Sequence, residues 1–298
     1  MVTRPGRAEH VVDAPLTPPS SSQGLLEVFR RRYLLRLLVA RELNARYAAS
    51  FLGFLWSYIN PLSQLFIYWF VLGKIVGMED RVPGDFAVHV FCGLVVVHFF
   101  TETFAAGTRS IVRNKSLVQK MALPREMFPV ASMLVSLFHV GPQLLILTVV
   151  CLFSGWVPDP VGLLALLLAL AIAMVLGTAL AILFSAANVF FRDFASAVGI
   201  LTNFVRFGAP MIYPFTLVEE RFGGFAPYYL LNPIADAVLL VQRAFWVGAT
   251  PDPDATAAEH LPDHLFLYGL GGLAASLVVL AVAQAVFSRF ENKVPERL

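Results

Sequence analysis

Apolar residues fall into long blocks along this chain, and short polar segments separate the blocks. Each block is close to the ~20 residues that an α-helix needs to cross ~30 Å of hydrocarbon. The pattern therefore predicts an all-α membrane protein with six transmembrane helices. They are expected at residues 55–76, 86–106, 127–153, 161–187, 195–215 and 265–287.

A seventh apolar stretch, residues 222–247, is interrupted by Gly223, Gly224, Pro227, Asn232 and Pro233. It can be one full crossing or a re-entrant hairpin that enters and leaves the same side. A full crossing would put the acidic loop at 252–263 inside and the basic C-terminus outside, against the positive-inside rule. We therefore expect a re-entrant periplasmic helical hairpin, whose interrupted backbone is satisfied by protein or by a water-filled cavity.

Two segments precede the first block. Residues 1–24 are rich in proline and serine and lack the apolar core of a signal peptide, so we expect a disordered cytoplasmic tail. Residues 25–47 are compatible with a helix whose arginines spread around the helical wheel. We expect this helix at the level of the lipid headgroups, where arginine side chains reach lipid phosphates. A helix packed on the cytoplasmic side of its own bundle explains the pattern equally well.

Charge between the blocks sets the orientation. The loop after the second block is strongly basic, whereas the loop after the first contains Glu79, Asp80 and Asp85. The positive-inside rule puts the basic loop in the cytoplasm. We therefore expect a multi-pass protein of the inner (plasma) membrane with both termini in the cytoplasm and with membrane lipids around it.

Composition and motifs exclude several function classes. Charged residues make up only 14% of the chain, against ~25% in soluble domains, which excludes a soluble enzyme. Walker-type GxxxxGK[ST], HExxH, GxSxG and CxxC motifs do not occur, so ATP hydrolysis would need another chain. Cys92 and Cys151 lie in apolar blocks without Cys or His at ligand spacing, which favours core packing and predicts no metal site.

Ionisable residues within the apolar blocks are functional candidates because they are costly in lipid. His98 and Glu102 lie four residues apart on one face of the second predicted helix, where a hydrogen-bonded pair near the interface is the alternative to a functional role. Arg206 lies near the middle of the fifth predicted helix. It could pair with Glu102, or face a polar pathway and bind a phosphate. His89 and His139 are interpreted as interface or packing residues.

The first predicted helix carries an aromatic stripe. Phe54, Tyr58, Leu65 and Trp69 fall on one side of a helical wheel. Such a stripe could stack against sugar rings in a channel. Packing against lipid, or an interfacial aromatic belt, explains it equally simply.

Four stretches resemble, in the expected order, the permeases of type-2 ABC exporters of polysaccharides. The similarity covers about Arg41 to Trp246 and includes permeases of O-antigen, teichoic acid and mycobacterial or actinobacterial galactan exporters. The stretches are RYAASFLGFLWSYINPLSQLFIYWFV, NKSLVQKMALPREMFPVA, NVFFRDF, and MIYPF followed by LNPIADAVLLVQRAF.

The resemblance implies a homodimer that works with two copies of a separate ATPase subunit. The pair would move a polyprenyl-pyrophosphate-linked polysaccharide outward, and Mg-ATP would bind to the partner subunit. This chain is then not an enzyme, and no cofactor, metal or nucleic acid is expected on it. The alternative is a type-2 ABC exporter of small lipids or drugs. A membrane-embedded glycosyltransferase or polymerase should instead show paired acidic residues or a large polar catalytic loop.

Three sets of site residues are expected: the resemblance implies the coupling interface and the exit hairpin, whereas the channel candidates come mainly from the ionisable residues and the aromatic stripe described above. The ATPase-coupling interface, with a coupling helix at about 109–125 and the turn at 191–193, would comprise Arg109, Arg113, Lys115, Lys120, Arg125, Glu126, Arg192 and Asp193. The substrate-channel candidates are Phe54, Tyr58, Trp69, Glu102, Arg206 and Tyr213. The exit hairpin would include Gly223, Pro227, Asn232 and Pro233. Arg206 departs from the family, in which an uncharged, often aromatic residue is expected at this position.

Overall fold

The computed structural model describes residues 24–48, 50–121, 123–291 and 294–297, and all regular elements in these ranges are helices. The predicted tail lies outside the described residues except for Gly24, which begins α1. Four of the described helices are long and apolar enough to cross a membrane. They are α4 (Phe86–Arg113), α6 (Met127–Phe153), α7 (Pro160–Phe190) and α13 (Leu265–Phe290).

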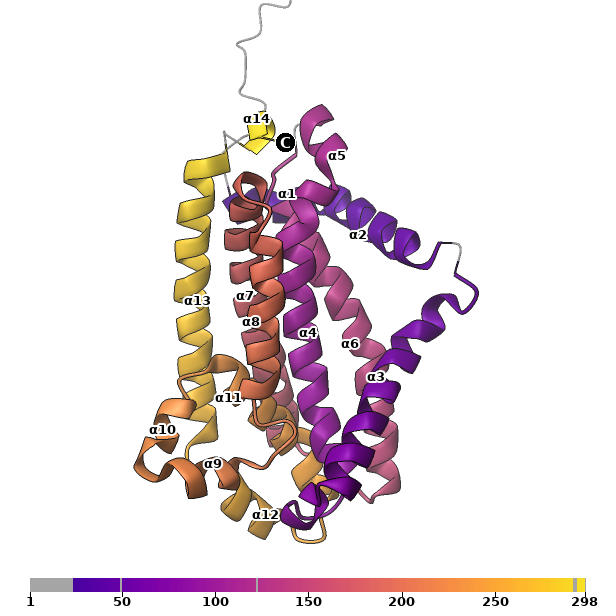
Figure 1. Cartoon of the computed structure of the whole chain (residues 1–298), viewed down its shortest axis with the longest axis vertical. Coiled ribbons are helices and arrows are strands. Elements are labelled where there is room, and N and C mark those ends of the chain that lie inside the picture. Colours follow the sequence, from indigo (N-terminus) through magenta and orange to yellow (C-terminus); the bar gives the residue numbers. More distant parts are fainter. Residues whose placement is uncertain (1–23, 49, 122, 292–293, 298) are drawn as a thin grey trace, which may run out of the picture.

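Helix α4 lies at the centre of the bundle, where it packs against α6 and α7, while α13 packs on α7 (Figure 1). In the apolar window of α4, 78% of the residues are buried, against 22% in α13, so α13 leaves most of its surface for lipid. Gly107 permits the close approach of α4 and α7, because a Cβ here would overlap the Cβ of Ala181. Small residues commonly allow membrane helices to pack this closely.

The first and fifth predicted spans are not single long α-helices. α3 (Trp56–Ile67) continues as a π-helical segment, η2 (Tyr68–Ile75), and together they cover nearly all of the predicted first span. α8 (Phe194–Gly208) has only 15 residues, so the predicted end at residue 215 is wrong. The backbone is extended at Ala209, because a residue that precedes a proline is disfavoured in the α-helical region.

The interrupted apolar stretch forms two short helical arms. Residues 215–229 and 233–249 meet at an angle of 114°, so the predicted break is present, and the first arm begins earlier than predicted. Asn232 caps the second arm, since its side chain accepts a hydrogen bond from the backbone N–H of Ile234. The arms contain α9 (Phe215–Phe222), η4 (Gly223–Phe225), α10 (Ala226–Tyr229), α11 (Pro233–Val241), η5 (Gln242–Trp246) and η6 (Val247–Ala249).

The two ends of the bundle carry different elements. The predicted N-terminal helix is broken at Arg31 into α1 (Gly24–Arg30) and α2 (Arg32–Tyr47), which lie across one end (Figure 1). α5 (Lys115–Lys120) and α14 (Val294–Arg297) lie at this same end, which we call the α5 end. The opposite end carries α9, α10 and α12 (Pro253–His260), and we call it the α12 end.

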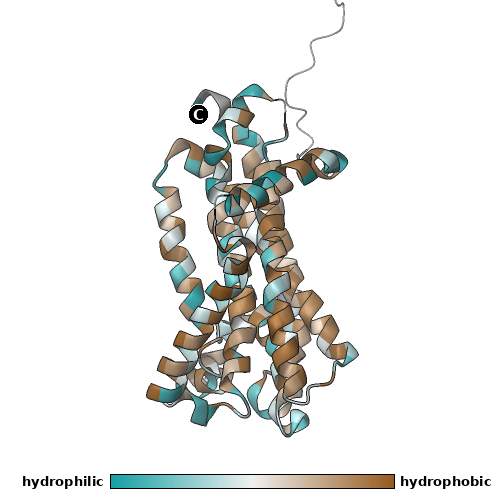
Figure 2. Ribbon diagram, turned by 90° about the vertical axis from the view of Figure 1, so that its right-hand side faces the viewer, coloured by the Kyte–Doolittle hydropathy of each residue, from teal (hydrophilic) through white to brown (hydrophobic). Residues whose placement is uncertain are grey.

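Helix α2 packs on the bundle while all four of its arginines are exposed. Leu35 and Leu38 are buried, and α2 contacts α6, so the alternative of a helix packed on its own bundle is correct for this side of α2. Between the two polar ends, apolar residues predominate along the helices (Figure 2). This distribution matches a bundle embedded in lipid over its middle.

Candidate functional site

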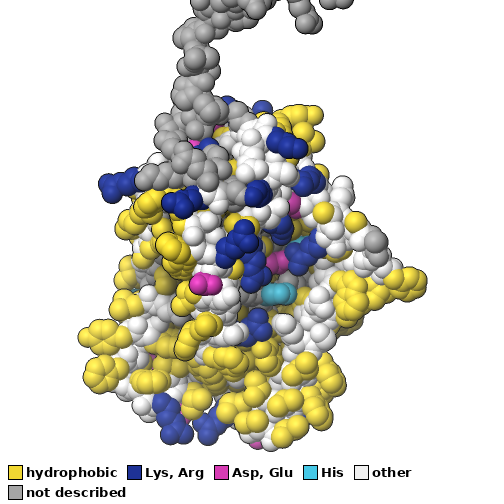
Figure 3. Space-filling model, turned by 45° about the horizontal axis from the view of Figure 1, so that its top comes forward, with side chains coloured by type: hydrophobic (Ala, Val, Ile, Leu, Met, Phe, Trp, Pro, Cys, Tyr) yellow, Lys and Arg dark blue, Asp and Glu magenta, His cyan; other side chains and the backbone are white. Residues whose placement is uncertain are grey.

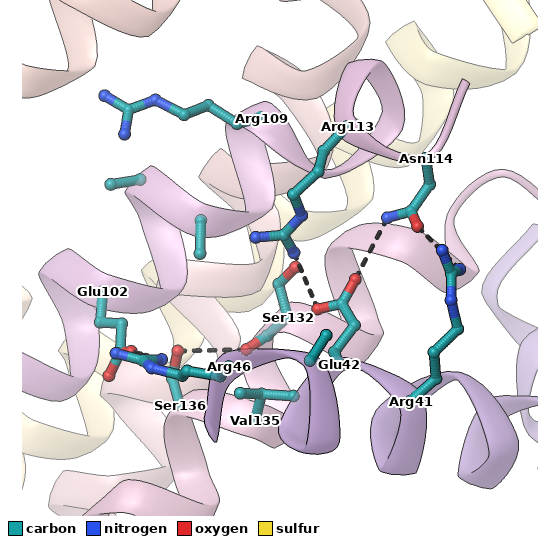
Figure 4. Close-up of a pocket in the computed structure, with 13 residues that line it drawn as sticks. Arg41, Glu42, Arg46, Glu102, Arg109, Arg113, Asn114, Ser132, Val135 and Ser136 are labelled. Atoms are coloured by element: carbon teal, nitrogen blue, oxygen red, sulfur yellow. Dashed lines mark hydrogen bonds and ion pairs between the residues drawn. The ribbon is translucent and has the colours of Figure 1, made fainter. Parts of the chain in front are cut away.

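A cleft of about 620 Å³ lies at the α5 end between α2, α4 and α6, and we call it the basic cleft. Basic side chains crowd this end of the molecule, with acidic and histidine side chains among them (Figure 3). The basic cleft is lined by Arg41, Glu42, Ala45, Arg46, Glu102, Ala105, Ala106, Arg109, Arg113, Asn114, Ser132, Val135 and Ser136 (Figure 4).

The outer part of the basic cleft fastens α2 to the end of α4. Glu42 accepts hydrogen bonds from Arg113 (Nη2 to Oε2, 2.8 Å) and from Asn114 (Nδ2 to Oε1, 3.1 Å) (Figure 4). Arg41 donates to the side-chain oxygen of Asn114 at 3.1 Å. Because Arg113 is half exposed, this ion pair contributes little stability, on the order of 0–1 kcal/mol. Its main effect is to fix the position of α2.

Two residues of this lining, Arg46 and Glu102, form a polar cluster with Tyr47 and His139, and we call these four residues the floor cluster. Arg46 and Glu102 form an ion pair, and the same carboxylate oxygen lies 3.3 Å from Nδ1 of His139. Nε2 of His139 lies 2.7 Å from the hydroxyl of Tyr47, which in turn lies 2.7 Å from Oγ of Ser57. The floor cluster thus joins α2, α3, α4 and α6 through polar contacts.

A second, smaller pocket is lined by all four residues of the floor cluster. This inner pocket has a volume of about 80 Å³ and includes His98 and Gln143, whose side-chain nitrogens Nδ1 and Nε2 lie 3.4 Å apart. Arg46 and Glu102 line both the basic cleft and the inner pocket. Their ion pair therefore lies at the boundary between the two cavities.

The basic cleft carries an excess of positive charge. Its lining contains four arginines and two glutamates, a formal excess of two positive charges. Arg41 bonds an amide oxygen, and Arg109 lies 3.5 Å from the backbone oxygen of Ala195 and points away from the other arginines (Figure 4). Neither forms an ion pair with a carboxylate of the described residues. Two guanidinium groups are therefore without a carboxylate partner beside a cavity, an arrangement suited to an anion.

The observed partners of Glu102 differ from those considered from the sequence. Its ion-pair partners are Arg46 and His139, and none of the described carboxylates forms an ion pair with Arg206, so the pairing of Arg206 with Glu102 is wrong. His139, interpreted as a packing residue, is instead a partner of Glu102. Sequence reasoning missed this cluster because 56 residues separate Arg46 from Glu102 and 93 separate it from His139. Only the fold-back of α2 brings these residues together.

Comparison with known proteins identifies the family of this chain. The family model of the ABC-2 type transporter matches residues 33–246, which is more than half of the chain. The chain belongs to the ABC-2 type transporter family. It is 28% identical to the O-antigen export system permease protein RfbA of Myxococcus xanthus over 273 residues, which cover 91% of this chain and 98% of that protein.

Two further relatives of this ABC-2 transporter are also named for the export or transport of a polysaccharide. It is 29% identical to the O-antigen export system permease protein RfbA of Klebsiella pneumoniae, over 72% of this chain and 82% of the relative. It is 22% identical to the polysialic acid transport protein KpsM of Escherichia coli, over 71% of this chain and 80% of the relative. The range matched by the family model, 33–246, includes α4 and α6 and all but the first residue of α2, the three helices that form the basic cleft.

In this ABC-2 transporter the predicted coupling residues fall into two groups. Lys115 and Lys120 are exposed on α5, and Arg192 and Asp193 are exposed in the turn between α7 and α8 at the same end of the bundle. These four side chains are accessible to a partner that docks on the α5 end. Arg113 is half exposed but is already paired across the cleft with α2.

Arg125 and Glu126 differ from the expected partner-facing position, because both side chains are buried. The guanidinium of Arg125 donates to the backbone oxygen of Glu291 and lies 3.9 Å from its carboxylate. Glu126 accepts a hydrogen bond of 2.8 Å from Gln284. These contacts tie the segment after α5 to the end of α13. Burial, with a smaller effect of Glu126, raises the pKa of Glu291.

The predicted aromatic stripe is divided among three segments: Phe54 precedes α3, Tyr58 lies in α3, and Trp69 lies in η2. The rings of Phe54 and Tyr58 meet edge-to-face with centroids 5.5 Å apart, and Phe54 also lies 5.7 Å from the ring of Tyr47 in the floor cluster. Trp69 lies farther along, in the π-helical segment, with the ammonium of Lys74 5.7 Å from its ring centroid. Phe54 and Tyr58 therefore accompany the floor cluster, whereas Trp69 belongs to another part of the helix.

Side chains of the hairpin and of the segment before it donate hydrogen bonds at the C-terminal end of α8 and just after it. The side chains of Tyr213 and Asn232 donate to the backbone oxygens of Phe207 (2.9 Å) and Gly208 (3.4 Å). Gln242 was not predicted as a site residue, and it donates to the oxygen of Pro210 at 2.8 Å. Carbonyls at a helix end have no partner within the helix, and in lipid they cannot bond to water. Tyr213, just before the first arm, and Asn232 supply donors to the end of α8, and Gln242 supplies one to the segment that follows.

Of the other predicted hairpin residues, Gly223 has φ of 51°, a left-handed conformation that glycine adopts without strain. Pro227 lies in the first turn of α10, and Pro233 begins α11. Proline fits these positions because the first N–H groups of a helix have no intrahelical acceptor. These residues therefore shape the hairpin.

Proposed function

We propose that this chain is the permease subunit of an ATP-driven exporter that moves a polyprenyl-pyrophosphate-linked polysaccharide across the cytoplasmic membrane. Membership of the ABC-2 family supports a transport role, and the names of the O-antigen and polysialic acid relatives support a polysaccharide cargo. ATP hydrolysis belongs to a separate ATPase subunit, because no nucleotide-binding motif occurs in this sequence.

The observation that carries this proposal is the basic cleft. Its formal excess of two positive charges suits an anionic headgroup at the α5 end of the bundle. The alternative function, export of small lipids or drugs, calls for a compact apolar cavity. An apolar pocket of about 440 Å³ does lie between α7, α8 and α13. We give more weight to the basic cleft, because two residues of its lining belong to the floor cluster, which joins four helices. We therefore favour the lipid-linked glycan.

In the proposed topology the α5 end lies in the cytoplasm. Arginines and lysines of α2 and α5 favour this side. The four long helices, α3 with η2, and α8 make six crossings, and the arms at 215–229 and 233–249 form a re-entrant hairpin on the outer side. Cysteines introduced at Glu220 and Gly224 should then react with a thiol reagent outside the cell, and a cysteine at Lys115 only from the cytoplasm. Reaction of Gly224→Cys from the cytoplasm alone would reject the hairpin.

Two copies of the chain would form the channel. Large apolar side chains are exposed along α3 and α8, among them Leu62, Phe66, Leu201 and Phe204. Contact between copies would remove such faces from lipid and leave a path between them. A polymer longer than the membrane is thick cannot be enclosed at once, so we propose a continuous channel. ATP would close the partner dimer and move α5, which would reshape this channel.

The test of this function is to deplete the chain in cells that produce it and to analyse the lipid-linked glycans chemically. Depletion should cause a polyprenyl-pyrophosphate-linked glycan to accumulate on the cytoplasmic face, and re-expression of the unchanged chain should remove it. An unchanged pool of glycan lipids, with accumulation of a small lipid instead, would favour the alternative function.

A further inference from the structure

The ion pair of Arg46 and Glu102 occupies a position at which it can control passage. Both side chains line the basic cleft of about 620 Å³ and the inner pocket of about 80 Å³. The two cavities therefore adjoin at this pair. Displacement of either side chain would alter the wall that the two cavities share.

The two partners differ in their freedom to move. The side chain of Arg46 is 49% exposed, whereas that of Glu102 is 14% exposed and also lies against His139. His139 is itself held by Tyr47 on its other ring nitrogen. If Arg46 moves away, Glu102 keeps His139 as a polar neighbour. The cost of leaving a buried carboxylate without any partner is thereby avoided.

A diphosphate group is a strong competitor for Arg46. Guanidinium groups bind phosphate oxygens with two parallel hydrogen bonds, which a single carboxylate oxygen cannot provide. Arg41 and Arg109 line the same cavity without carboxylate partners among the described residues. A diphosphate diester carries two negative charges at neutral pH, which equals the formal charge excess of the lining.

We infer that the basic cleft binds the diphosphate of the cargo lipid and that Arg46 and Glu102 are its gate. This inference rests on the proposed function and adds a binding site and a gating pair to it. The incoming diphosphate takes Arg46 from Glu102, and the basic cleft then connects with the inner pocket. Tyr47 follows Arg46 directly and contacts Ser57 of α3, so the exchange also shifts the junction of α2 with the first membrane helix.

Opening of the gate can be measured as the accessibility of position 143, because Gln143 lines the inner pocket and is 2% exposed. The full-length protein with Gln143→Cys, together with its ATPase subunit in lipid nanodiscs, is treated with a small charged thiol reagent. Native Cys92 and Cys151 are fully buried and give little background. Farnesyl diphosphate should raise the rate at which the introduced thiol reacts by about tenfold, equivalent to ~1.4 kcal/mol in the opening equilibrium. Pro61→Cys, at another buried residue of the inner pocket, serves as a second reporter if Gln143→Cys does not fold.

Matched variants separate the gate from general charge. Glu102→Gln should give the fast reaction without ligand, whereas Glu42→Gln, which removes the same charge from the outer cleft, should leave the reaction slow. Arg46→Ala should weaken binding of farnesyl diphosphate. Equal rates in Glu102→Gln and Glu42→Gln, or ligand binding without faster labelling, would overturn the gate. Inorganic pyrophosphate distinguishes a free diphosphate from a lipid headgroup. If it speeds labelling as farnesyl diphosphate does, the cleft recognises the diphosphate alone. If it has no effect, the diphosphate must carry a prenyl chain.

The export assay keeps the two proposals apart. If the unchanged complex exports the lipid-linked glycan but farnesyl diphosphate neither binds nor speeds labelling, the gate is wrong and the proposed function stands. If the complex binds farnesyl diphosphate and labelling accelerates, but depletion leaves the glycan lipids unchanged, the diphosphate site stands and the polysaccharide cargo is wrong.

Discussion

A buried hydrogen bond just after the C-terminal end of α8 should contribute measurably to the stability of the protein. Gln242 is 1% exposed and donates a hydrogen bond of 2.8 Å to the backbone oxygen of Pro210. Gln242→Leu keeps the approximate size of the side chain but removes the donor. A buried acceptor without a partner costs about 1–3 kcal/mol. We expect the variant to be less stable by this amount.

Thermal unfolding of the detergent-solubilised chain measures this loss. Using about 2–4 °C per kcal/mol for domains of this size range, the midpoint should fall by roughly 2–12 °C. Tyr213→Phe is the control, because it removes a bond to the oxygen of Phe207 from a more exposed site, together with the 3.1 Å contact with the hydroxyl of Tyr229. If the midpoint of Gln242→Leu falls no further than that of Tyr213→Phe, burial of the Pro210 carbonyl is not the cause and the reasoning is refuted.

Three further predictions concern the α5 end and the membrane interior. Reversing the charge of the exposed residues Lys115 and Lys120 to Glu should uncouple ATP hydrolysis from export by about tenfold or more while the protein still inserts; unchanged coupling in a reconstituted complex would argue against α5 as the contact. Arg206→Ala should reduce export severalfold, and adding Glu102→Ala should not restore it, since Glu102 is paired elsewhere; restoration would show a functional pair. The raised pKa of Glu291 means that the folded state binds this proton more tightly than the unfolded state. Stability should therefore fall as pH rises from the ordinary value of ~4.3 through the raised pKa. Glu291→Gln should flatten that dependence in unfolding measurements from about pH 4 to 8, and an unaltered slope would contradict it.

The extent to which the sequence predicts the fold depends on how local each signal is. α6 has the predicted bounds, 127–153, because charged residues or a Gly–Trp turn flank an unbroken apolar block. α4 was predicted to end at residue 106 but extends to Arg113, because its last turns pack in the bundle although their residues are polar. Pro210 lies within the predicted fifth span, and α8 ends before it because a residue that precedes a proline is disfavoured in the α-helical region.

The site was less predictable than the fold. Glu102 was identified as costly in lipid, but its partners come from α2 and α6, and no local spacing connects them. Arg125 and Glu126 resemble an exposed charged loop in the sequence, whereas contacts with the end of α13 bury them. In both cases the deciding contacts join residues that are far apart along the chain.

The length of α8 has a consequence for the surrounding bilayer. At 1.5 Å per residue its 15 residues extend about 22 Å, against about 39 Å for the 26 residues of α13. A helix this much shorter than ~30 Å of hydrocarbon costs a fraction of a kcal/mol per Å of mismatch if lipid surrounds it. Acyl chains would have to shorten beside α8 and lengthen beside α13 within a single molecule. The lipid annulus is therefore expected to be interrupted at α8, and protein or water is expected to adjoin this helix.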